Sequence, residues 1–153
     1  MSNTFYLDEC FEDIVDKVIE LLELEIVQGG ELENVKSVVR GDRARNRPDL
    51  PCLWVFPQQA RAEIDTGLTE KWFLPLVFIS IVKNHDVELG YREANKIALK
   101  ARKIIIKNKT LGLRDFVRHT RSTQFQPSGQ WQDDKTLFSS GATVEVEFRI
   151  REV

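Results

Sequence analysis

One stretch of the chain, from Lys71 to Val82, is apolar at nearly every position. It reads KWFLPLVFISIV, and both of its alternating sets of side chains are apolar. A strand of this kind is buried on both faces, so its sheet needs a covering layer on each side. A polar turn over residues 84–86 and a helix-period segment from Tyr91 to Lys107 follow. The sequence therefore predicts a long strand, a crossover helix and another strand that starts at Leu113.

Two helices are predicted from apolar residues at three- and four-residue spacing. The first covers residues 7–27 and ends at Gly29-Gly30, because paired glycines disfavour a helix. The second covers residues 91–107, and its small alanines allow close approach to a sheet. Their apolar stripes are Phe11, Ile14, Val15, Val18, Ile19 and Leu22 in the first, and Ala94, Ile97, Ala98, Ala101, Ile104 and Ile105 in the second.

Further strands are predicted where β-branched residues or alternation occur. They cover residues 32–40, 52–56 with a continuation through 60–64 after Pro57, 113–125 and 143–149. The segment 126–135, which carries Trp131, is expected to be a long loop. We predict an α+β fold with a single mixed, mostly antiparallel sheet and two main helices packed on it, in the order α-β-β-β-α-β-β. A length of 153 residues suits one domain over 1–153.

Charge is polarised along the chain although the net charge is only -2. Residues 8–31 carry nine acids and one lysine, whereas bases dominate residues 83–121. These opposite charges can pair within one fold or between neighbouring copies, and composition does not choose between the two. An acidic docking face on the first helix is the alternative to a helix that only covers the sheet.

Cysteine usage and hydropathy indicate an intracellular protein. Cys10 and Cys52 have no metal-ligand spacing, so we expect two buried thiols. Acids between residues 8 and 13 interrupt any signal-peptide core, and no apolar run reaches the roughly 18 residues of a membrane span. We expect the protein to stay in the cytosol where it is made.

No catalytic constellation is found. Nucleotide-binding, nucleophile-elbow and zinc-protease motifs are absent from the sequence. His85 and His119 lack a matched carboxylate or nucleophile, and Asp133-Asp134 is more typical of a solvated loop than of a cation site. We therefore expect a protein that is not an enzyme and that has no cofactor and no metal.

Several features occur in a characteristic order along the chain. They are the acidic first helix, the apolar strand ending near Val82, Tyr91 with Ala94, Ala98 and Ala101, the run Lys109-Thr110-Leu111-Gly112, and the strand Phe138, Gly141 and Val144 to Phe148. In this order, the chain resembles the phage tail terminator or tail-completion family of head-tail joining, minor tail proteins. The resemblance covers most of the chain except the loop 40–48.

The resemblance implies a structural virion protein of a tailed phage or prophage. Such a protein forms a ring, commonly a homohexamer, at the head-proximal end of the tail, where it ends tube polymerisation and joins tail to head. The implied partners are other copies, the tail tube protein and a head-completion or connector protein, with DNA only passing through the ring. The implied location is the virion, with the host cytoplasm during assembly and no membrane.

Seven residues are our interface candidates, chosen for their side-chain type and position. Arginine makes fork-like hydrogen bonds to carboxylates and phosphates, and exposed tryptophans anchor partners. The candidates are Arg43, Arg45, Arg47, Trp72, Arg118, Arg121 and Trp131.

Three alternatives remain open at the level of sequence. Another neck or head-tail connector protein has the same general properties. A nucleic-acid-binding module would use the loop Arg40–Arg47, although this loop has no aromatic residues to stack on bases. A small enzyme is the third alternative, but no residues support it.

Overall fold

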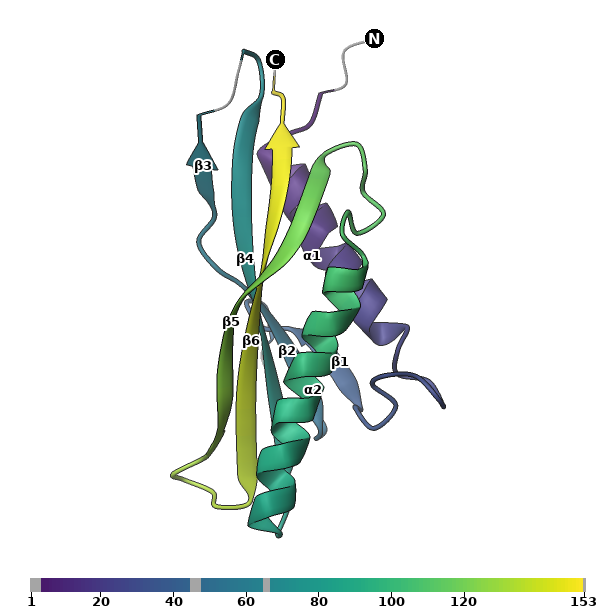
Figure 1. Ribbon diagram of the computed structural model, residues 1–153, viewed down its shortest axis with the longest axis vertical. Coiled ribbons are helices and arrows are strands. Elements are labelled where there is room, and N and C mark those ends of the chain that lie inside the picture. Colours follow the sequence, from purple (N-terminus) through teal and green to yellow (C-terminus); the bar gives the residue numbers. More distant parts are fainter. Residues whose placement is uncertain (1–3, 45–47, 65–66, 153) are drawn as a thin grey trace.

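The computed structural model describes residues 4–44, 48–64 and 67–152 (Figure 1). The chain forms two helices packed on one mixed, mostly antiparallel six-stranded sheet, which confirms the predicted α+β class. In chain order, the elements are α1 (Leu7–Glu23), β1 (Ser37–Arg40), β2 (Cys52–Pro57), β3 (Arg61–Glu63), β4 (Glu70–Lys83), α2 (Val87–Lys107), β5 (Val117–Gln130) and β6 (Leu137–Ile150).

The sheet is organised around the long β4–β6 pair. Its strand order is β1-β2-β4-β6-β5, and β3 pairs with the first part of β4. The antiparallel β4–β6 ladder runs from Glu70 opposite Ile150 to Lys83 opposite Leu137. Since β6 lies between β4 and β5, α2 crosses over β6 to connect two parallel strands, as the sequence predicted. Among the described strands, only β1 and β2 form a parallel ladder.

Element boundaries differ from the predicted ones at several places. The second helix begins at Val87 instead of residue 91, and the last strand begins at Leu137 instead of residue 143. The first helix ends at Glu23 instead of residue 27, and the first strand begins at Ser37 instead of residue 32. The fifth strand begins at Val117 and continues to Gln130, so the first half of the expected loop 126–135 is strand. The chain leaves β2 at Pro57, and the predicted continuation after it forms the separate strand β3, so four strands precede α2.

The two helices begin in different ways. The Oδ1 atom of Asp86 accepts a hydrogen bond from the Leu89 backbone N–H at 3.1 Å, which caps α2. Tyr6 provides no side-chain cap for α1. Instead, the backbone N–H of Leu7 donates to Oε1 of Glu152 at 2.9 Å. The start of α1 is therefore fixed by a residue from the far end of the chain.

The core lies between the helices and one face of the sheet. Residues of β4 at even positions point into it, and Leu76, Phe78 and Val82 are fully buried. The hydroxyl of Ser80 donates to the carbonyl oxygen of Ala94 at 2.7 Å, which ties β4 to α2. Both helices thus cover the same face, as Figure 1 shows on its right-hand side. No helix in the described ranges is long and apolar enough to cross a membrane.

We expect the thiol of Cys10 to be inert in the folded protein. Burial, followed by the nearby carboxylates of Asp13 and Glu9, raises the pKa of Cys10 from 9.0 to about 12. Above pH 9 the unfolded thiol ionises while the buried one stays protonated, so the free energy of unfolding falls as the pH rises towards 12. Denaturant titrations between these pH values should show a shallower fall for Cys10→Ala. An equal slope for both proteins would contradict the prediction.

Candidate interaction surface

The second face of the sheet carries no helix in the part of the chain that the structure describes. Odd-numbered residues of β4 point towards this side, which we call the open face. Phe73 and Ile81 are nearly buried there, at 5% and 7% exposure, but Val77 and Ile79 are partly exposed. The sequence predicted a strand that needs cover on both faces, and the fold covers only one of them.

One half of the open face is apolar. Trp54 and Phe56 of β2 stack with their ring centroids 5.5 Å apart, and they pair in register with Ile79 and Val77 of β4. On the other side of β4, Gly141 of β6 has no side chain to cover the sheet, which leaves a depression there. There is room for a side chain, because a Cβ atom at this position would meet nothing closer than 3.8 Å. A hollow of about 560 Å³ lies here, lined by Val77, Gln124, Phe125, Gln126, Gly141 and Thr143.

The other half of the open face is charged. Glu145 is 11% exposed and accepts two hydrogen bonds from Arg121, at 2.6 and 3.1 Å, and one from Arg61 at 3.5 Å. The guanidinium carbon of Arg61 lies 4.3 Å from the ring centroid of Phe73. Both arginines remain half exposed, so these ion pairs contribute little stability. Their effect is to hold two guanidinium groups at fixed places on the surface.

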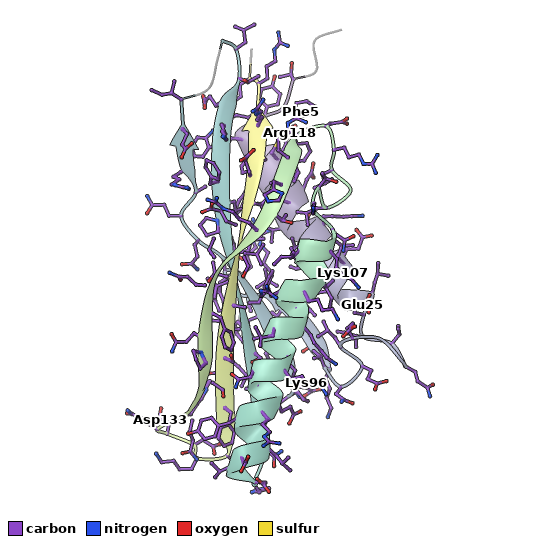
Figure 2. All side chains as sticks on the ribbon, in the orientation of Figure 1. Phe5, Glu25, Lys96, Lys107, Arg118 and Asp133 are labelled. Carbon is purple, nitrogen blue, oxygen red and sulfur yellow. The ribbon has the colours of Figure 1, made fainter. Side chains whose placement is uncertain are left out.

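Three more arginines lie at the end of the charged half that is farthest from the apolar half. Arg118, Arg149 and Arg151 line a hollow of about 290 Å³ together with Phe5, Thr69, Asp115 and Ile150. Backbone hydrogen bonds of 2.7 and 3.0 Å between Phe5 and Arg151 fix the two ends of the described chain beside one another. Figure 2 shows Phe5 and Arg118 together at this end of the molecule. The open face is therefore most basic at the end where Phe5 and Arg151 meet.

The outward side of α1 is acidic over its whole length. Five carboxylates at helical spacing lie opposite its buried residues: Glu9, Asp13, Asp16, Glu20 and Glu23. We call this set the acidic stripe. Its ion pairs with described residues are Lys17–Glu20 at 3.6 Å and Arg40–Asp16 at 3.8 Å. Just beyond it, Leu24 and Val27 are 62% and 56% exposed.

Arginines at the end of β1 bind carboxylates within the molecule. The side chain of Arg40 is 10% exposed and donates to Glu12 at 2.7 Å and to Asp42 at 2.8 Å. Arg43 also donates to Glu12. These contacts connect α1 to the end of β1. They also occupy two of the four arginines on which the nucleic-acid alternative depends.

Glu12 should make the fold sensitive to acid. Hydrogen bonds from Arg40 and then Arg43 lower the pKa of this carboxyl. Its stabilising contribution is present above the usual Glu pKa of about 4.3 and is lost as the pH falls through the lowered value. We expect Glu12→Gln to be less stable at pH 7 and to lose less stability on acidification. The effect is small, because the side chain is 38% exposed. Urea titrations at several pH values measure it, and identical acid dependence would contradict the assignment.

The predicted interface residues do not form one site. Arg121 lies in the charged half of the open face, and Arg118 lies at its basic end. The indole N–H of Trp131 donates to the hydroxyl of Ser139 at 3.2 Å, so this ring folds back on its own domain. Trp72 points to the helix-covered side, since its partner across the ladder is the buried Phe148. Arg43 contacts α1, while Arg45 and Arg47 lie outside the described residues.

The sequence analysis missed the residues that form most of the open face. Trp54, Phe56, Arg61, Gly141 and Glu145 come from three separate strands and meet only through the strand register. The sequence did contain one indication of this face: both alternating sets of side chains in residues 71–82 are apolar, which predicts a second apolar face of the strand. It did not show which strands flank that face.

Comparisons with known proteins add no family assignment. No family model and no curated protein matches the chain. Within the described residues, no group of three or more His, Cys, Asp or Glu side chains comes together as a metal site. The functional proposal therefore rests on the surface geometry and on the resemblance of the sequence.

Proposed function

We propose that this chain is a structural virion protein of a tailed phage or prophage. Copies of it form a ring, expected to be a hexamer, at the head-proximal end of the tail. This ring ends polymerisation of the tail tube and joins the tail to the head. The observation that carries the proposal is the open face, whose apolar half is left without a covering layer by the described elements.

Burial of apolar surface is the physical reason for assembly. A central strand with large side chains on both faces gains free energy when the second face leaves water, at roughly 25 cal/mol per Å². Trp54 and Phe56 are suited to this role, because aromatic residues are enriched in the cores of protein interfaces. A second copy of the chain supplies the missing layer, and a chain of copies that closes on itself is a ring.

The order of elements supports the same assignment. An acidic N-terminal helix, a long apolar strand, an alanine-rich crossover helix and a C-terminal hairpin occur in the order that resembles tail terminators. Another neck or head-tail connector protein remains the alternative within this class. DNA binding through residues 40–47 is less favoured, because Arg40 and Arg43 already bind carboxylates.

The test is assembly of the purified protein. Light scattering over a range of concentrations should show a species of several subunits, and negative-stain electron microscopy should show rings with a central hole. Added to polymerising tail-tube protein from the same phage genome, the protein should bind one tube end and stop elongation. A monomer at all concentrations that neither binds tubes nor limits their length would overturn the proposal.

DNA binding is measured in the same preparation to separate the alternatives. Fluorescence anisotropy with a labelled duplex at low salt should show no binding by the isolated subunit. Tight binding that weakens steeply with salt would favour the nucleic-acid alternative, because phosphate contacts release counterions.

A further inference from the structure

We propose that neighbouring copies pack head to tail, with the acidic stripe of α1 and the apolar residues beyond it seated on the open face of the next copy. This inference rests on the proposed ring and deepens it, because it names the two surfaces that meet. The occupant of the open face is thus a second copy of this chain.

The acidic stripe and the open face carry opposite charges. The acidic stripe presents five carboxylates with few cations among the described residues near them. The open face presents Arg61 and Arg121, whose two positive charges share the single carboxylate of Glu145. Beyond them, three arginines and one acid, Asp115, line the terminal hollow, so the face keeps an excess of positive charge there. Opposite potentials on two surfaces favour their association and fix their register.

Both surfaces change from charged to apolar in the same direction along the molecule. The stripe starts at Glu9, near the end where Phe5 meets Arg151, and leads to the exposed Leu24. The open face starts with arginines at that same end and leads to Val77 and Trp54. In Figure 1, α1 runs from the end of the molecule that holds both termini towards its middle.

The distance from the charged end to the apolar end is similar on the two surfaces. At 1.5 Å per helical residue, Glu9 and Leu24 are about 22 Å apart along α1. At 3.3 Å per strand residue, Thr69 and Val77 are about 26 Å apart along the sheet. Copies related by rotation about an axis parallel to the long dimension of the molecule therefore set acid against base and apolar against apolar.

The two surfaces also lie on opposite sides of the subunit. The stripe faces away from the sheet on the helix side, whereas the open face is the other side of the sheet. A contact between them is heterologous, and such contacts generate a closed ring or a filament. A two-fold contact through α1 would instead place acids against acids.

Pairing of sheet edges is a weaker explanation for assembly. The long edge strand β5 has register shifts at three places and contains Pro127, and both features disfavour addition of another strand. Arg118 and Arg121 add charge along the same edge. A face of the subunit is thus a better surface for a neighbour than the β5 edge.

Charge reversal tests the pairing. The first variant reverses the stripe with Asp13→Lys and Glu23→Lys, neither of which has an ion pair with a described residue. The second reverses the open face with Arg61→Glu and Arg118→Glu. Each variant alone should need an at least about tenfold higher concentration to assemble, because like charges then meet. A matched control, Lys96→Glu with Lys107→Glu on α2, should assemble as the wild type does; Figure 2 shows both lysines on the helix side.

Mixing the two reversed variants gives the sharper result. In an equimolar mixture, each reversed surface meets its reversed partner and each native surface meets a native one, so alternating rings should form. Circular dichroism and thermal unfolding confirm that every variant is folded. Wild-type rings with no effect of either reversal, or no rescue on mixing, would overturn the pairing and leave the proposed ring intact. A wild-type protein that never assembles would overturn both.

Discussion

Replacing Phe78 with alanine is expected to lower the free energy of unfolding by about 3–5 kcal/mol, as is typical of a large side chain deleted from a core. Phe78 is fully buried on the helix-facing side of β4, between Val55 of β2 and Ala142 of β6 in the register. The deletion removes apolar burial and leaves a cavity that β4, held by neighbours on both sides, cannot collapse to fill. Urea titration at constant m-value measures the loss.

The matched control is Phe125→Ala in β5. This phenylalanine is 41% exposed, so the same substitution should cost less than about 1 kcal/mol. Similar losses at the two positions would mean that the core does not lie between the helices and the even-numbered face of β4.

Replacing Gly90 with valine should destabilise the protein by about 1–3 kcal/mol, although glycine is usually the poorer residue in a helix. A Cβ atom at this position would lie 2.3 Å from the ring of Phe138, which is itself fully buried. Either α2 or the ring must move, and the ring also packs against Tyr91 at a centroid distance of 5.0 Å. The loss is read from thermal or chemical unfolding.

A smaller residue at position 138 should relieve part of this clash. In a double-mutant cycle with Phe138→Leu, the valine should cost less than it does alone, since the two positions are in contact. Gly141→Ala is the control, because its Cβ atom would have only ordinary contacts of 3.8 Å or more. Strict additivity at positions 90 and 138 would contradict the close approach of α2 to β6.

The parts of the fold with a strong local signal were predictable from sequence. The apolar stripe of Ala94, Ala98 and Ala101 and the unbroken apolar run before it predicted α2 and β4 within a few residues. The start of β5 was less predictable, since Leu113 continues an apolar pattern but belongs to a turn in which Val117 donates to its carbonyl oxygen. The turn is also held from outside, because Phe116 within it packs against Phe5, with ring centroids 5.6 Å apart.

The candidate surface was only partly predictable, for a reason of geometry. The excess apolar surface of residues 71–82 is a property of one segment and could be read directly. The ion pairs of Glu145 with Arg61 and Arg121 join residues from separate strands, and they exist only because β3 and β6 flank β4 while β5 flanks β6. Arginine-rich composition drew attention to residues 40–47, where Arg40 and Arg43 prove to be engaged with Glu12 and Asp42.

The backbone bridge between Phe5 and Arg151 has a practical consequence for labelling. It places the beginning and the end of the described chain at one extremity of the long β4–β6 ladder. The turns at residues 84–86 and 131–136 lie at the opposite extremity. If copies stand side by side with their long dimensions parallel, a gold-binding tag on either terminus decorates one rim only. A tag inserted beside Asp133 decorates the other rim. Comparing the two labels in rings bound to a tail tube therefore reveals which rim contacts the tube.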